Sequence, residues 1–289
     1  MRARALHADA LVITSSVLHL NCVLLRGAGE GPQPQGPLGV IDVPAGGRGS
    51  AGESFLIDSP VLPDELAMLP AVLEQARFPP LSGLLATHAD WDHLLGPLAF
   101  PDSVLGCAQS SARRLAAEPG LAQRELRAFD EELHLERSRP LALGAPHALP
   151  VPGHLEIGRR ELELHPAEGH TADGMAIWAP WAGVLVVGDY LSAIEIPMLS
   201  PGGGRSAYIA TLEHLRGLVE QAEHVVPGHG PILDSSAALE ILGQDLAYLE
   251  ALGERGVAAE LPRGGRSRAQ RRLHERNVAA LEPGATRRS

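Results

Sequence analysis

The chain has 289 residues, of which 45% are hydrophobic and 20% are charged. This balance excludes disorder along the whole chain and fits one α/β domain with helical additions. All 24 basic residues are arginine, which excludes chemistry that needs a lysine amine, such as a Schiff base or the phosphate-binding lysine of a P-loop. The formal net charge of −11 and the 3% aromatic content argue against nucleic acid or an anionic membrane as a partner.

The N-terminal region is rich in short apolar runs that predict β-strands. They are ALVIT near Leu11, LNCVLL near Val23 and SFLID, which ends at Asp58. A secretory signal peptide is the alternative for the first run, but Asp9 interrupts it and no small-residue cleavage site follows. Two cysteines cannot form a disulfide framework, and no apolar stretch reaches the ~20 residues of a membrane helix. We therefore expect a cytoplasmic protein.

Strands and helices alternate along the rest of the chain, which predicts sheets covered by helices. Leucines at helical spacing follow Pro63, and a second leucine stripe marks the last long helix. The predicted strands are 81–87 and 183–188, and the predicted helical segments are 109–137, 207–221 and 236–253.

The C-terminal part differs from the rest in composition. From Arg255 onward the chain has nine arginines and three glutamates. We expect one domain over residues 1–235 and a helical extension over 236–289 that packs on it and ends in an arginine-rich tail. The loop 200–206 contains three consecutive glycines and is a candidate lid.

The motif THADWDH, residues 87–93, follows the buried strand 81–87 directly and carries four possible metal ligands. In an extended segment His88, Asp90 and Asp92 would point to one side, and His93 would turn the other way as the chain bends. The early pair could then serve one metal ion and the late pair another. A salt-bridged surface loop is the alternative, but the segment itself contains no arginine to neutralise the carboxylates.

Three further polar residues follow β-like runs. They are His170 in EGHTADGM, Asp189 after GVLVVG and His229 in VVPGHG. Together with Asp58 and THADWDH, this series resembles the motifs of the metallo-β-lactamase superfamily over roughly residues 8 to 235. The resemblance, and in particular that to the glyoxalase II and lactonase branch, implies an α/β fold of four layers, an αββα sandwich with C-terminal helices and metals at one edge of two facing sheets.

The resemblance also implies the roles of individual residues. The first metal would be held by His88, Asp90 and His170. The second would be held by Asp92, His93 and His229, and Asp189 would bridge the pair. Asp58 would orient ligands from the end of its strand without binding metal itself. Two divalent ions per chain are expected, zinc first, with iron or manganese as alternatives.

Asp90 departs from the family, because most hydrolases of this superfamily have histidine there. A carboxylate is a harder ligand than imidazole, so the ligand set of the first site is closer to those of iron or manganese sites. The charges of two divalent cations, three carboxylates and one hydroxide sum to zero, whereas a first site with three histidines would leave a net charge of +1. We therefore expect the metal ions here to be weaker Lewis acids. Flavodiiron proteins also carry an acidic residue at this position, although theirs is glutamate.

These residues predict a hydrolase in which a metal-bridged hydroxide attacks an ester, thioester or lactone carbonyl of a small-molecule substrate. Asp92 is the candidate for moving the proton to the leaving group, and Tyr190 is a candidate oxyanion donor. The alternative is a di-iron oxidoreductase that needs an external electron donor. A homodimer is possible, and neither a nucleic acid nor a membrane is expected as a partner.

Overall fold

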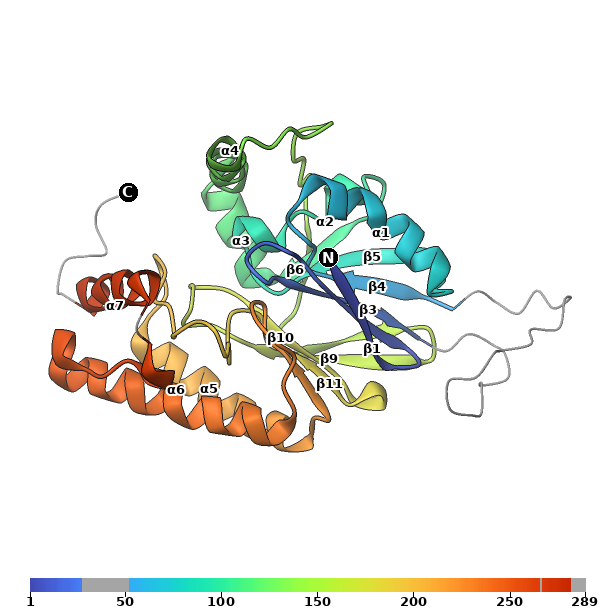
Figure 1. Cartoon of the computed structure of the whole chain (residues 1–289). Helices are drawn as coiled ribbons and strands as arrows, with labels where there is room; N and C mark the ends of the chain where they lie inside the picture. The colour runs from blue at the N-terminus through green and yellow to red at the C-terminus, as the bar shows by residue number, and fades with distance from the viewer. Residues whose placement is uncertain (28–51, 266, 282–289) are drawn as a thin grey trace, which may run out of the picture.

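Two β-sheets face each other, and helices cover their outer faces (Figure 1). The computed structural model describes residues 1–27, 52–265 and 267–281. The first sheet has seven strands in chain order, β1 to β7, and the second has five in the order β12-β11-β10-β9-β8. The fold is therefore the expected αββα sandwich.

The first sheet begins with antiparallel hairpins and continues with parallel strands from β4 onward. Its strands are β1 (Arg2–His7), β2 (Ala10–Thr14), β3 (Asn21–Arg26), β4 (Ser54–Ile57), β5 (Leu81–Ala86), β6 (Leu105–Ala108) and β7 (His147–Leu149). The N-terminal apolar run is thus a strand of this sheet, as its sequence predicts.

The second sheet is antiparallel except where β11 and β12 run parallel. Its strands are β8 (Gly153–Ile157), β9 (Arg160–Pro166), β10 (Met175–Ala179), β11 (Val184–Val186) and β12 (His224–Val226). Apolar side chains of both sheets, among them Val23, Ile57 and Ile177, form one buried cluster between them. This interior holds the two sheets face to face.

The helices form the two outer layers. α1 begins as expected at Pro63, a residue whose fixed φ suits the first helical turn, and buries its leucines against the first sheet. The helices on this side are α1 (Pro63–Gln75), α2 (Gly96–Ala99), α3 (Gln109–Ala117) and α4 (Leu121–Leu133), with the 3-10 turn η1 (Trp91–His93). The single helical segment expected over 109–137 is divided at Gly120, where φ is +76°.

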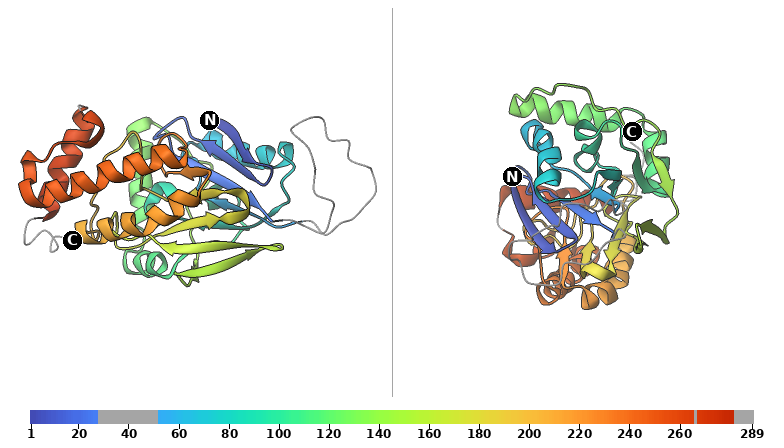
Figure 2. Two further views of the ribbon diagram at one scale, coloured as in Figure 1. Left: turned by 90° about the horizontal axis from the view of Figure 1, so that it is seen from below. Right: turned by 90° about the vertical axis from the view of Figure 1, so that its right-hand side faces the viewer.

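The opposite layer lies on the second sheet and contains the longest helices, which run side by side beneath it (Figure 2). Its elements are α5 (Arg205–Gln221), α6 (Ser235–Arg255) and α7 (Arg268–Leu281), with the 3-10 turns η3 (Gly256–Ala258) and η4 (Pro262–Gly264). The 3-10 turn η2 (Pro180–Ala182) connects β10 and β11 and packs against the interior between the sheets. Leu242 and Leu249 of α6 share one core with Leu212 of α5 and Leu185 of β11. α6, which lies in the segment expected to be a C-terminal extension, thus forms part of the outer layer of the sandwich. The domain boundary itself stays a prediction.

Among the described residues, no helix combines the length and the apolar character needed to cross a bilayer.

Candidate metal centre

The loops that follow five strands meet at one edge of the sandwich. β4 is followed by Asp58, β5 leads into the THADWDH segment, and the loops after β9, β11 and β12 carry His170, Asp189 and His229. Ligands commonly bind at the carboxyl ends of parallel strands, because the connecting loops converge there. The structure brings all seven residues of the expected ligand set to this place. They form three overlapping groups of three, and within each group the candidate ligand atoms lie within 4.8 Å of one another. One group, His88, His93 and Asp189, connects the other two.

The groups divide as the sequence predicts. His88, Asp90 and His170 form one cluster, called here the first cluster. Asp92, His93 and His229 form the second cluster. The local reason differs from the expected strand alternation, because β5 ends at Ala86, residues 87–90 bend, and the chain then turns through η1. Asp92 and His93 reach the second cluster through this turn, so the prediction that Asp92 shares a side with His88 and Asp90 is wrong.

Both histidines of the second cluster are fixed through Nδ1. The Nδ1 atom of His93 lies 2.9 Å from Oδ2 of Asp58, and Nδ1 of His229 donates to the backbone carbonyl of Leu18 at 2.9 Å. Each Nε2 atom therefore faces the centre. Asp58 also accepts bonds from the amide and the hydroxyl of Thr87, at 2.8 and 2.9 Å, and this matches the orienting role expected for it.

The histidines of the first cluster are fixed in the same way. The Nδ1 atom of His170 donates to the carbonyl of Met198 at 3.0 Å, and Nδ1 of His88 lies 3.1 Å from the hydroxyl oxygen of Thr87. All four imidazoles thus present Nε2, with the other nitrogen engaged by the protein, which is the usual arrangement of metal-binding histidines.

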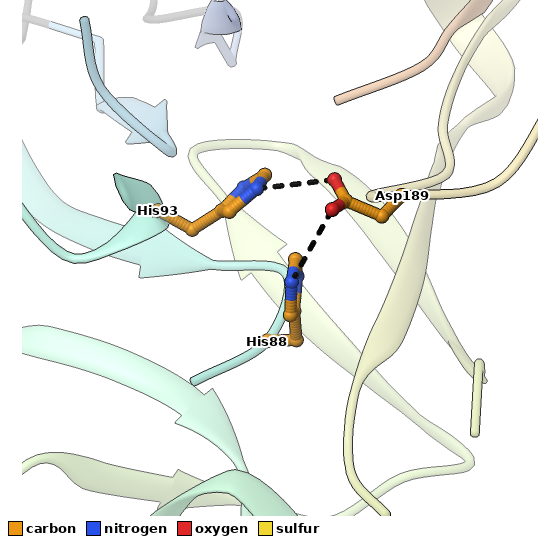
Figure 3. A group of neighbouring side chains, drawn as sticks. All are labelled: His88, His93 and Asp189. Carbon is orange, nitrogen blue, oxygen red and sulfur yellow. Dashed lines mark ion pairs between the residues drawn. The ribbon is translucent and has the colours of Figure 1, made fainter. Parts of the chain in front are cut away.

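Asp189 lies between the two clusters, and its two oxygens face different ones. Oδ1 is 3.1 Å from Nε2 of His93 and 3.4 Å from Nε2 of His229. Oδ2 is 3.4 Å from Nε2 of His170 and 3.9 Å from Nε2 of His88. Figure 3 shows the carboxylate facing both His88 and His93. A carboxylate placed like this can join two metal ions.

The donor set fits divalent metal ions. Nε2 of His88, Nε2 of His93 and Oδ1 of Asp189 are buried and have no hydrogen-bond partner within the described residues. Buried polar atoms without partners are costly, so their convergence on one point indicates a ligand that satisfies them. Imidazole and carboxylate together suit zinc, iron and manganese.

The ionisable groups of the cluster stabilise one another's charged forms in the metal-free protein. Burial raises the pKa of Asp189, but the charges of His229 and His93 lower it by more. The net effect is a pKa well below the usual range of an aspartate. Burial opposes protonation of His229, yet Asp189 and Asp92 raise its pKa to about 10. The pKa of His93 is likewise raised well above its usual range, because Asp58 and Asp189 outweigh its burial. A cation that binds here must displace these protons.

Asp90 has a partner that its own segment does not contain. Nη1 of Arg114, on α3, lies 2.7 Å from Oδ1 of Asp90 and 2.9 Å from Oδ1 of Asp173. The absence of arginine from THADWDH therefore does not leave Asp90 without a counter-charge. Arg114 lies 24 positions after Asp90 and no local motif marks it, whereas Asp173 belongs to the GHTADG motif and could have been singled out there.

Tyr190 lies beneath the cluster. It is 3% exposed, its ring contacts that of Tyr208, and its hydroxyl oxygen accepts the amide hydrogen of His170 at 3.0 Å. Burial raises the pKa of its hydroxyl. This position favours a role in holding the backbone of His170 over that of an oxyanion donor.

The segment 192–199 forms one wall of the centre and is tied to the C-terminal helices. Asn277 of α7, which is fully buried, donates to the carbonyl of Pro197 at 2.6 Å and accepts the amide hydrogen of Leu199 at 2.9 Å. The carbonyl of Met198 between them holds His170. A pocket lined by Glu195 and Met198, among others, opens beside His170. Asn277 was not expected from the sequence.

The glycine-rich loop 200–206 packs closely against the backbone around His170. The amide of Gly204 donates to the carbonyl of Gly169 at 2.9 Å, and a side chain at Gly203 would collide with the carbonyls of Gly169 and His170. This packing favours a fixed support over the lid that the composition suggested.

The Metallo-beta-lactamase superfamily model matches residues 48–229. A curated relative, "Metallo-beta-lactamase type 2" from Bacillus sp. (strain 170), is 26% identical over 137 residues, which are 45% of this chain. These residues span 52% of that relative, so the chain spans about half the length of the curated protein it matches.

Solved structures show the same fold. A metallo-beta-lactamase from Pontibacter korlensis has a TM-score of 0.60 and 16% identity, with 86% of this chain and 98% of that chain covered. A metallo-beta-lactamase family protein from Thermus thermophilus also has a TM-score of 0.60, with 20% identity and coverage of 86% and 83%. At these identities the likeness concerns the fold.

Proposed function

Because the chain belongs to the metallo-beta-lactamase superfamily, we propose that it is a dinuclear metal-dependent hydrolase of an ester, thioester or lactone. The observation that carries the proposal is Asp189, whose two oxygens face two separate pairs of histidine Nε2 atoms. Two ions held there would supply an activated water near neutral pH and would polarise the substrate carbonyl.

The residues of the chain have separate tasks in this proposal. The two clusters hold the metals, and Asp58 keeps Nε2 of His93 turned toward them. Asp92 lies at the rim with 12% of its side chain exposed, and Oδ2 is 3.4 Å from Nε2 of His229. From this place an Asp92 oxygen would take the proton of the attacking water and return it to the leaving oxygen or sulfur. The pocket beside His170 would receive the substrate.

The experiment begins with metal-free protein reconstituted with zinc, manganese or iron. We would assay p-nitrophenyl acetate, an acyl thioester, a lactone and, since the curated relative is called a β-lactamase, a chromogenic β-lactam. We expect hydrolysis of at least one carbonyl substrate that depends on added metal. Activity that survives complete metal removal, or protein that binds no metal, would overturn the proposal.

A di-iron oxidoreductase is the second candidate, and Asp90 is the observation that favours it. A carboxylate beside His88 and His170 gives the first cluster a ligand set that suits iron. The iron-loaded protein should then consume oxygen when an external electron donor is supplied, whereas the zinc-loaded protein should not. If the zinc-loaded protein hydrolyses a substrate and the iron-loaded protein consumes no oxygen, the oxidoreductase is excluded and the hydrolase is supported.

A further inference from the structure

Asp90 is held from outside the cluster by a network that joins three segments of the chain. Arg114 comes from α3, Asp90 from the loop after β5 and Asp173 from the loop after β9. The other oxygen of Asp173 accepts the amide hydrogen of Ala89 at 2.9 Å. Asp173 is 1% exposed and Arg114 is 18% exposed at the side chain, so the network is largely protected from water.

The two oxygens of Asp90 have different surroundings. Oδ1 contacts the guanidinium of Arg114 at 2.7 Å. Oδ2 faces the first cluster, at 3.3 Å from Nε2 of His170 and 3.6 Å from Nε2 of His88. A free aspartate can bind a metal ion through one oxygen or through both. Here Nη1 of the guanidinium forms an ion pair with one of them.

We propose that Arg114 is a positioning residue that restricts Asp90 to a single oxygen ligand, so that this carboxylate presents one donor atom as a histidine does. Asp173 contacts the same Nη1 atom of Arg114 and so holds the guanidinium beside Asp90. The inference rests on the proposed metal binding at the first cluster.

The ligand mode affects the choice of metal. Manganese favours carboxylate oxygens, whereas zinc favours few ligands and accepts imidazole nitrogen readily. Replacing Arg114 with methionine would free the second oxygen of Asp90 for the metal. The affinity for manganese should then rise relative to that for zinc. Because both ions are divalent, the ratio is insensitive to the lost positive charge and to general loosening of the site.

The test measures stepwise manganese and zinc affinities of metal-free protein by competition with a chelator of known affinity. We compare Arg114→Met in the parent with Arg114→Met in an Asp90→His background, where no second oxygen exists to be freed. In the parent, the manganese-to-zinc ratio at the first cluster should rise by at least ~10-fold, the lower end of effects caused by residues that orient metal ligands. In the Asp90→His background it should stay within about twofold. Arg113→Met, an exposed neighbour on the same helix, is the control and should leave the ratio unchanged.

Other outcomes overturn the inference. An unchanged ratio in the parent means that Arg114 does not restrict Asp90, and an equal change in both backgrounds means that it acts through the fold. If Arg114→Met does not fold, Arg114→Lys replaces the two-armed guanidinium with a single ammonium, and a smaller rise in the same direction is required. Failure of the parent to bind either metal would contradict the proposed function itself.

Discussion

The first and second clusters share Asp189 but depend on different supports. The second cluster is fixed by Asp58 and by the carbonyl of Leu18, which act directly on the Nδ1 atoms of His93 and His229. The first cluster contains the carboxylate of Asp90, where the family resemblance implies histidine, and its outer supports are longer, running through Arg114 and through α7. A carboxylate needs restraint on its second oxygen, whereas an imidazole needs only one hydrogen bond to fix its ring. The carboxylate thus accounts for the contact with Arg114, whereas α7 supports the imidazole of His170 through the carbonyl of Met198.

The largest effect is expected where both clusters meet. Asp189→Ala removes the only carboxylate that faces both histidine pairs among the described residues, so hydrolysis should fall by ~10³-fold or more. Measured turnover of the ester or thioester substrate checks this. His147→Ala is the matched control, because His147 is exposed at the start of the edge strand β7. Equal losses in the two variants would show that the ligand assignment is wrong.

Proton competition should affect both clusters. Asp189 and Asp92 raise the pKa of His229 to about 10, so this ring holds a proton at pH 7 in the metal-free protein. The pKa values of His93 and His170 are raised in the same direction. Protonated rings cannot bind a cation. Zinc affinity should therefore rise as pH increases from 6 to 9, by ~10-fold per pH unit for each proton displaced. Calorimetry in buffers of different ionisation enthalpy measures the protons released, and affinity that is flat over this range would contradict the assigned histidines.

Asp58 should support the second cluster more than the first, because it contacts Nδ1 of His93 directly and reaches His88 only through the hydroxyl of Thr87. Asp58→Asn keeps the shape but removes the charge that Nδ1 of His93 faces, so one metal should bind ~10- to 100-fold more weakly while the other is little affected. Chelator competition with zinc resolves the two affinities. Asp102→Asn, an exposed site, provides the control for loss of a carboxylate. A uniform loss at both metals would mean that the two supports are not separate.

The support from α7 should have the smallest effect. Asn277→Leu leaves the carbonyl of Pro197 and the amide of Leu199 without partners, which costs about 1–3 kcal/mol for each buried group left unsatisfied. Denaturant unfolding measures this loss, and metal affinity of the first cluster should fall slightly through the carbonyl of Met198. Glu275→Leu on the exposed face of α7 is the control. Unchanged stability in Asn277→Leu would show that α7 does not support the 192–199 wall.

The αββα fold followed from the family resemblance, whereas the residues that meet at the candidate metal centre could be singled out for a physical reason. Ligands that follow buried strands are marked by the strands themselves, so Asp189 after GVLVVG and His229 after a β-like run could be recognised without coordinates. Arg114 and Asn277 could not, because each is one polar residue on a helix and its partner is set by how that helix packs. The turn that brings Asp92 to the second cluster was also missed, since strand alternation ends with β5 at Ala86 and the 3-10 turn follows at Trp91.

The number of metal ions bound per chain decides whether the two clusters are two metal sites. Metal-free protein is titrated with zinc while bound metal and melting temperature are followed together. We expect two equivalents per chain and a rise in stability with each, of about 2.7 kcal/mol when free zinc is 100 times the dissociation constant. Saturation at one equivalent, or melting that does not respond to zinc or to chelator, would contradict a dinuclear centre.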